Sequence, residues 1–252
     1  MAVVDSHCHA SLGWYEPVES LLSQMDRHRV DHAVLIQIQG QTNNDYQAAC
    51  VRRYPGKFAS VVIVDVESPN ASAQLSRLAE MGAAGVRLRA GERSPGNDPL
   101  AIWRTAERLG ITVSCAGSAN EFGSRDFAQL VEAFPRLNIV IEHLAGLKAS
   151  DIEPARRAVV DGIFALARFS NVAMKLPGLG EFCRRLLPVA EPFPFEAPIP
   201  PFLEEAFQAF GPNRLMWGSD YPPVSGREGY AGALWFPRER LASKGGADLD
   251  LM

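Results

Sequence analysis

The sequence of 252 residues has no hydrophobic run long enough to cross a membrane. A transmembrane helix needs about 20 consecutive apolar residues. The first residues also lack the basic start and apolar stretch of a secretory signal peptide. The four cysteines, Cys8, Cys50, Cys115 and Cys183, are scattered and form no Cys-x-x-Cys pair. We therefore expect a cytoplasmic protein whose thiols are reduced.

A block of basic residues is missing as well. The chain has 25 Lys and Arg against 29 Asp and Glu, which gives a formal net charge of -4. Proteins that bind nucleic acid by neutralising phosphates concentrate positive charge on one face. We therefore expect a small molecule as partner, and neither nucleic acid nor a membrane. The sequence leaves the assembly state open, with a homodimer as one option.

What the sequence does have is an alternation of short apolar runs with amphipathic stretches, which is typical of repeated βα units around a parallel sheet. Several of the amphipathic stretches end at Gly or Pro, as helices often do. The predicted strands cover Ala2–Asp5, His32–Gln39, Phe58–Asp65, Gly85–Arg89, Ile111–Cys115, Asn138–His143, Asn171–Leu176 and Arg214–Ser219. The predicted helices include Val18–Arg29, Asn44–Tyr54, Ala71–Met81, Leu100–Leu109, Arg125–Phe134 and Pro201–Phe210.

Eight βα repeats in a chain of this length predict one α/β domain over residues 1–252, a (β/α)8 TIM barrel. An open, doubly wound sheet is the alternative, but no Gly-x-Gly-x-x-Gly motif follows the first strand. Two segments depart from the alternation of predicted strands and helices. The segment 187–201 is rich in proline and is either a loop over the barrel mouth or a plain surface connection. The polar C-terminal sequence, broken at Gly245-Gly246, predicts a short or frayed final helix.

Polar residues at strand ends are the candidates for chemistry, because barrel enzymes place their catalytic residues there. His7 and His9 are two residues apart, so strand alternation directs both imidazoles, together with Asp5, to one side. His143 and Asp220 end two later apolar strands. Three imidazoles and a carboxylate are ligand types that Zn²⁺ prefers.

Five motifs now stand in order along the chain, and together they resemble the amidohydrolase superfamily. The pattern is most similar to its amidohydrolase-2 branch, whose members include hydrolases of sugar-acid and dicarboxylate lactones. The resemblance covers residues 2 to about 225. The motifs are Val4-Asp5-Ser6-His7-Cys8-His9, Gly85-Val86-Arg87, Glu142-His143-Leu144-Ala145-Gly146, Asn171-Val172-Ala173-Met174-Lys175-Leu176 and Gly218-Ser219-Asp220-Tyr221-Pro222.

The resemblance implies that His7, His9, His143 and Asp220 are the metal ligands, and that Asp220 and His143 are catalytic. Asp220 would act as general base on a water molecule and pass the proton to the leaving oxygen. Many members of the superfamily carry a bridging Lys or Glu on strand four and a His on strand five. Here those strands carry arginines and Cys115-Ala116-Gly117, which argues against a binuclear centre. The lactonase branch shares this lack, so we expect one divalent metal, with Zn²⁺ as the first candidate, or no metal.

Five further residues are candidates for substrate binding. Arg87 and Arg89 share one strand face, and a guanidinium matches a carboxylate or a developing oxyanion. Gln37, Lys175 and Tyr221 lie at or near other strand ends and could complete the polar surroundings. Cys8, Cys115 and Glu142 are interpreted as structural, since alternation turns Cys8 and Glu142 away from the barrel axis.

Each candidate also has a plain structural interpretation. The histidine pair could be hydrogen-bonded at a strand end, His143 could be a core imidazole, and Asp220 could cap a turn. Arg87 and Arg89 could pair with neighbouring acids. Two other functions stay open: a decarboxylase or hydratase acting on an unsaturated carboxylic acid, and a binding barrel without activity. The first hypothesis remains a hydrolase that opens a small cyclic ester, a lactone, or cleaves a related C–O or C–N bond.

Overall fold

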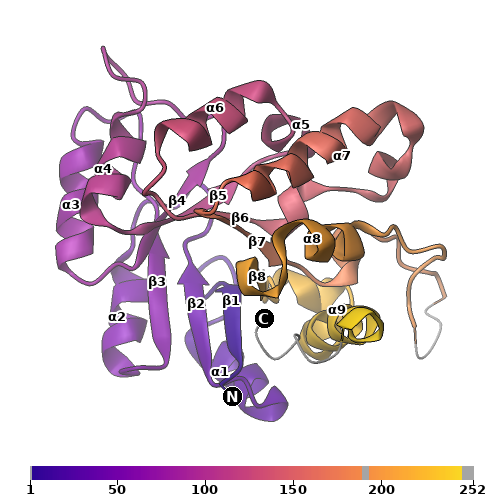
Figure 1. Ribbon diagram of the computed structural model, residues 1–252. Coiled ribbons are helices and arrows are strands. Elements are labelled where there is room, and N and C mark those ends of the chain that lie inside the picture. Colours follow the sequence, from indigo (N-terminus) through magenta and orange to yellow (C-terminus); the bar gives the residue numbers. More distant parts are fainter. Residues whose placement is uncertain (1, 189–192, 246–252) are drawn as a thin grey trace.

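A computed structural model describes residues 2–188 and 193–245 (Figure 1). Eight parallel strands form one sheet, in which the spatial order is the order along the chain. Successive strands are parallel neighbours because the connection between them crosses over through a helix and returns the chain to the starting end of the sheet. The strands are β1 (Val4–Cys8), β2 (His32–Ile36), β3 (Phe58–Val62), β4 (Gly85–Arg89), β5 (Thr112–Ala116), β6 (Ile139–Ile141), β7 (Val172–Leu176) and β8 (Leu215–Trp217).

The sheet closes between β1 and β8, just beyond the end of β8. Cys8 and Tyr221 form a parallel bridge, and the backbone amide of His9 donates to the carbonyl of Tyr221 over 2.8 Å. The amide of Asp220 donates to the carbonyl of His7, also over 2.8 Å. The predicted (β/α)8 TIM barrel is thereby confirmed, and His7, His9 and Asp220 lie at its closing seam.

Helices follow the strands and surround the sheet (Figure 1). In α4 the apolar side is buried, with Ile102, Trp103 and Ala106 inside, and Gly110 ends the helix with φ 67°. The α-helices of the described chain are α1 (Val18–His28), α2 (Asp45–Arg53), α3 (Ala71–Glu80), α4 (Ala101–Leu109), α5 (Ala119–Phe122), α6 (Arg125–Ala133), α7 (Arg157–Phe164), α8 (Phe202–Phe210) and α9 (Gly229–Gly245). Short 3-10 turns are η1 (His143–Gly146), η2 (Ala149–Ile152), η3 (Pro154–Arg156), η4 (Ala165–Arg168), η5 (Leu179–Glu181), η6 (Pro212–Arg214) and η7 (Pro223–Gly226).

The final helix is longer than the sequence analysis expected. α9 has 17 residues and ends at Gly245, and its irregular feature is Pro237 inside the helix. Tyr230, Ala233 and Leu241 are buried on the side that faces the barrel. Tertiary packing of this apolar side stabilises a helix that the polar end of the sequence does not suggest.

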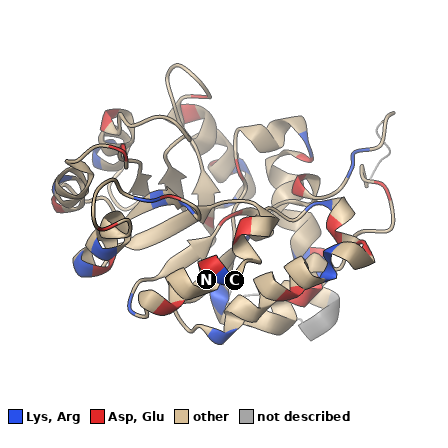
Figure 2. Cartoon of the chain, turned by 90° about the horizontal axis from the view of Figure 1, so that it is seen from above, with Lys and Arg blue, Asp and Glu red and all other residues tan. Residues whose placement is uncertain are grey.

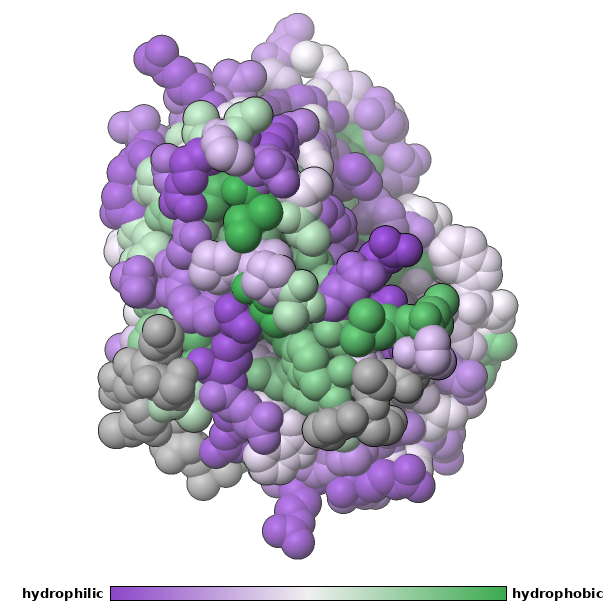
Figure 3. Space-filling model, turned by 90° about the vertical axis from the view of Figure 1, so that its right-hand side faces the viewer, coloured by the Kyte–Doolittle hydropathy of each residue, from purple (hydrophilic) through white to green (hydrophobic). Residues whose placement is uncertain are grey.

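The proline-rich segment between β7 and α8 is anchored to α9. The rings of Phe193 and Phe195 have their centroids 5.4 and 6.2 Å from that of Phe236 on α9. The described parts of this segment lie at the right-hand side of the molecule in Figure 1. Figure 3 shows that side, where apolar and hydrophilic residues are intermingled. Residues 189–192 lie outside the described chain. The described part favours a surface connection over a loop covering the mouth.

The surface carries both signs of charge. Figure 2 shows Lys and Arg interspersed with Asp and Glu over the outer helices. Over the described ranges, no helix combines the length and apolar character needed to cross a bilayer.

Candidate active site

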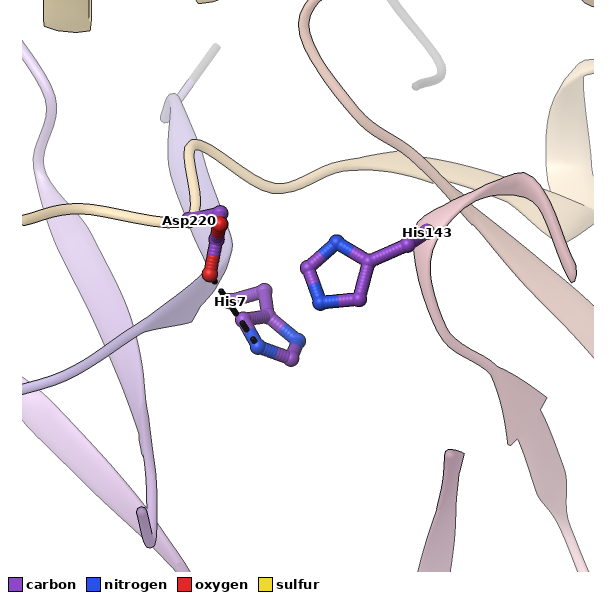
Figure 4. Close-up of side chains that lie close together, drawn as sticks. All are labelled: His7, His143 and Asp220. Atoms are coloured by element: carbon purple, nitrogen blue, oxygen red, sulfur yellow. Dashed lines mark ion pairs between the residues drawn. The ribbon is translucent and has the colours of Figure 1, made fainter. Parts of the chain in front are cut away.

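Three side chains from distant parts of the sequence converge at the barrel mouth (Figure 4). His7 lies on β1, His143 begins the turn after β6, and Asp220 follows β8. The rings of His7 and His143 have centroids 4.4 Å apart, and His7 Nε2 lies 3.9 Å from Asp220 Oδ1. One donor atom from each residue lies within 4.8 Å of the other two. The structure therefore brings together three of the four predicted ligands.

His9, the fourth, approaches the same carboxylate from the end of β1. Its Nδ1 lies 2.7 Å from the carbonyl oxygen of Ile36, and its Nε2 lies 3.3 Å from Asp220 Oδ1. A carbonyl oxygen only accepts hydrogen bonds, so Nδ1 carries a hydrogen and donates it. The orientation of this ring is thus fixed by β2, and Nε2 is directed at Asp220.

His143 and Asp220 both have left-handed backbone conformations, with φ 49° and 56°. Non-glycine residues rarely adopt this region, and such conformations cluster at functional sites. At Asp220 the conformation is held by two backbone hydrogen bonds, to the His7 carbonyl over 2.8 Å and from the Val224 amide over 3.0 Å. The strained turn directs the carboxylate toward the histidines.

A glycine beside His7 allows this arrangement. A Cβ atom at Gly218 would lie 2.6 Å from the Cβ of His7, which is too close for two carbon atoms. Any larger residue at the end of β8 would displace His7 or the strand. Gly218 therefore sets the distance between β8 and the first histidine.

Asp5 does not point with the histidines, contrary to the alternation argument. The β1–β2 register shifts between Asp5 and Cys8, and such an irregularity redirects the side chains beyond it. The Asp5 carboxylate accepts hydrogen bonds from the Ser219 amide over 2.9 Å, from Ser219 Oγ over 2.6 Å and from the Tyr230 hydroxyl over 3.0 Å. It joins β1 to the segment that carries Asp220.

Glu142 lies inside the barrel, so the interpretation that it turns away from the axis was wrong. Strand β6 ends at Ile141, and alternation no longer fixes the direction of the next side chain. Arg87 binds Glu142 through Nη2 and Oε2 over 2.7 Å, and its Nη1 donates to the Gln37 carbonyl over 2.9 Å. Burial opposes ionisation, but Arg87 and Lys175 lower the pKa of Glu142 to about 2. Arg87 is therefore engaged within the protein.

Lys175 lies beneath His7. Its Nζ is 3.1 Å from His7 Nδ1 and donates to Ser114 Oγ over 2.8 Å, while Ser114 Oγ donates to Glu142 Oε1 over 2.7 Å. Burial lowers the pKa of Lys175 to about 8, with Arg87 acting in the same direction. Burial and the nearby lysine also lower the pKa of His7 well below its usual range. A neutral imidazole is therefore the stable form of His7 at neutral pH.

The other predicted substrate ligands are placed differently. Arg89 is exposed at the end of β4. Gln37 is buried and holds its own loop, since its Nε2 donates to the Asn43 carbonyl over 2.7 Å. The structure does not bring Tyr221 to the site: its ring packs edge-on against Tyr230, with centroids 5.9 Å apart.

Two residues at the site were missed by the sequence analysis. The ring of Tyr15 has its centroid 5.5 Å from that of His9. Tyr15 could have been predicted from its position in the loop after β1, because such loops lie at the end of the barrel where active sites form. Arg227 Nη2 donates to Asp220 Oδ2 over 3.0 Å. No sequence motif predicted the role of Arg227, because its contact with Asp220 depends on the turn that follows Asp220 and returns the chain toward the site.

The donor set fits one divalent cation. His7 Nε2 is buried without a hydrogen-bond partner among the described residues, and it faces Asp220. Burial opposes ionisation of Asp220, but the hydrogen bond with His9 and the charge of His143 hold its pKa well below the usual range. Two imidazoles and an ionised carboxylate are a suitable set for Zn²⁺. In the described part of the chain, this is the one cluster of three such side chains with converging donor atoms.

Comparisons with known proteins agree with this barrel. A search of curated proteins found no match. An amidohydrolase from Burkholderia multivorans with bound zinc has 19% identity and a TM-score of 0.76, covering 100% of this chain and 96% of that one. A probable 2-pyrone-4,6-dicarboxylic acid hydrolase from Acinetobacter baumannii with bound citric acid has 19% identity and a TM-score of 0.71, with 99% and 96% covered.

A 2,6-dihydroxybenzoate decarboxylase from Rhizobium is similar as well, with 15% identity, a TM-score of 0.62 and coverage of 100% and 95%. At these identities the solved structures show a shared fold and no more. The family model described as amidohydrolase matches residues 4–250, nearly the whole chain. With the histidines and the aspartate gathered at the mouth of an eight-stranded barrel, this match shows that the chain belongs to the amidohydrolase-2 family.

Proposed function

We propose that this protein is a hydrolase that opens a small lactone by attack of water, with Asp220 as general base. The observation that carries the proposal is the contact of one ionised carboxylate with two imidazoles at the barrel mouth. Asp220 Oδ1 lies 3.3 Å from His9 Nε2 and 3.9 Å from His7 Nε2. A water molecule beside Oδ1 would have an acceptor for its proton and imidazoles to orient it.

The chain's own residues carry the proton through the reaction. Asp220 Oδ1 accepts a proton from water as the water oxygen bonds to the lactone carbonyl carbon. The ring C–O bond then breaks, and Asp220 returns the proton to the leaving alkoxide, giving a hydroxy acid. In this scheme without a metal, His143, which is half-buried and lies across from Asp220 (Figure 4), would donate a hydrogen bond to the carbonyl oxygen as negative charge develops.

A metal would complement this scheme. A carboxylate with a pKa far below 7 is a weak base toward free water. His7, His143 and Asp220 would hold one divalent ion, for which we propose Zn²⁺, with His9 beside them. Such an ion, when bound, would polarise the carbonyl or lower the pKa of the water.

We assign recognition of the substrate to residues around the mouth of the barrel. Arg89 is exposed at the end of β4, so its guanidinium is available for a carboxylate or hydroxyl-rich lactone. Tyr15 offers an apolar ring beside His9. Arg87 and Lys175 support Glu142 and His7 from below, and Gln37 shapes the loop after β2.

The second candidate function is decarboxylation of an unsaturated or aromatic carboxylic acid. The similar decarboxylase from Rhizobium favours it. We rank it lower because the inward side chain of β5 is Ser114, which donates to Glu142, and not the additional strand-five histidine expected of such enzymes.

The test is a paired substrate screen with the purified protein, with and without added Zn²⁺ or Mn²⁺. Sugar-acid, dicarboxylate and simple aliphatic lactones are followed by acid release, and aromatic and dienoic acids by CO2 release. We expect acid release from at least one lactone class and no CO2. CO2 release without lactone opening would establish the second candidate instead. If neither acid nor CO2 is released but a ligand binds, the protein would be a binding barrel without activity.

A further inference from the structure

Arg227 connects the candidate base to the neighbouring loop. It lies between η7 and α9, and its side chain is 22% exposed. Nη2 donates to Asp220 Oδ2 over 3.0 Å, and Nη1 forms an ion pair with Glu181 of η5. One guanidinium thus joins the segments that follow β7 and β8. Because a guanidinium is planar and rigid, it fixes the relative orientation of its two partners.

The two oxygens of Asp220 therefore have different surroundings. Oδ2 is bound to Arg227, whereas Oδ1 faces His9 and His7. Rotation about the bond to the carboxyl group would exchange the two oxygens, and that torsion is normally soft. The charge-assisted hydrogen bond from Arg227 opposes this rotation.

The surroundings of Arg227 are built to hold it. Its Nε lies 3.9 Å from Glu228 Oε2, and Glu228 Oε1 accepts a hydrogen bond from the Gly180 amide over 3.2 Å. A Cβ atom at Gly180 would collide with the Glu228 carboxylate and lie 2.8 Å from Cβ of Arg227. A larger residue at position 180 would push this loop away from Arg227.

We propose that Arg227 is a positioning residue, which holds Asp220 so that Oδ1 is the reacting oxygen and Oδ2 the anchored one. The kinetic part of this inference rests on the proposed function, because it concerns the base of that reaction. Arg227 does not touch the substrate in this account. Its loss should therefore lower kcat and leave KM nearly unchanged, since misplacement of a reacting group by about 1 Å can cost on the order of 100-fold.

The kinetic test uses three variants of the full chain on a lactone that the wild type opens. Arg227→Gln should lower kcat roughly 10- to 100-fold, with KM within about threefold, and Arg227→Lys should retain more activity. Arg227→Gly should regain activity when guanidinium is added at millimolar concentration. Arg214→Gln is the matched control, since Arg214 is also half-buried and donates to the Phe169 carbonyl over 2.9 Å just before β8, at the opposite end of this strand from Asp220. An unchanged kcat in Arg227→Gln, or no rescue by guanidinium, would overturn the proposal.

A second test does not depend on turnover. A crystal structure of Arg227→Gln should show the Asp220 carboxylate rotated, with the 3.3 Å contact between Oδ1 and His9 Nε2 broken or shared between both oxygens. An Asp220 that keeps its orientation without the guanidinium would contradict the proposal. If the wild type opens no lactone, the proposed function fails, and this structure still decides whether Arg227 positions Asp220.

Discussion

Arg87 and Glu142 form a two-pronged ion pair inside the barrel. Nη2 of Arg87 lies 2.7 Å from Oε2 of Glu142, and Nε lies 3.1 Å from Oε1. The pair joins β4 to the end of β6 directly below the histidines, and Ser114 and Lys175 extend it to His7. The charges beneath the candidate site therefore form one connected network.

Breaking this pair should destabilise the protein strongly. Glu142→Gln leaves the Arg87 guanidinium inside the barrel without a counter-charge, and loss of one partner of a buried pair costs about 3–5 kcal/mol. Urea unfolding measures the change. Glu19→Gln is the control, because the Glu19–Arg53 pair is exposed and should contribute little. Equal losses of unfolding free energy in the two variants would show that the buried pair contributes no more to stability than the exposed one.

Lys175 should make stability depend on pH. Its pKa is about 8 in the folded protein against an ordinary value of 10.5, so between these values the unfolded chain binds more protons. The free energy of unfolding of the wild type should therefore rise with pH over this range, relative to Lys175→Met, by at most about 3 kcal/mol. Parallel curves from pH 8 to 10.5 would refute the low pKa.

Gly218→Ala should damage both the fold and the site. The new Cβ would lie 2.6 Å from Cβ of His7, and overpacking of this kind costs about 1–3 kcal/mol. We expect a lower midpoint of urea unfolding and weaker metal binding. Gly13→Ala is the matched control, because no atom lies within 4 Å of its added Cβ. A variant at Gly218 that matches this control would mean that β8 can move away from His7 at little cost.

Metal binding should not exceed one ion per chain. Arg87 and Ser114 occupy the inward positions of β4 and β5 at this level, and neither supplies a bridging ligand. Titration of the chelator-treated protein with Zn²⁺ should give a stoichiometry of one or less, and His143→Ala should lower the affinity. His32→Ala is the control, because its ring binds the Gly56 carbonyl at the protein surface. Two bound ions per chain would contradict this account of the site.

The strands, the barrel and the meeting of His7, His9, His143 and Asp220 could be predicted, because they depend on local periodicity and on the rule that strand ends share one edge. Side-chain direction beyond a strand end could not. Glu142 follows β6 and turns inward, and the left-handed turn at Asp220 sends Tyr221 to the outer layer. The partners of Arg87 and Arg227 could not be predicted from the sequence either, since each contact depends on how the chain folds between the two residues.

The most direct test of the account is the turnover of a lactone substrate by Asp220→Asn. The amide keeps the shape of the carboxylate but cannot accept the proton of water, and general base catalysis contributes about 100- to 10,000-fold. We predict that kcat falls by at least about 100-fold, while circular dichroism and the unfolding midpoint show a folded barrel. Full activity in this variant would contradict the role of Asp220 and with it the proposed mechanism.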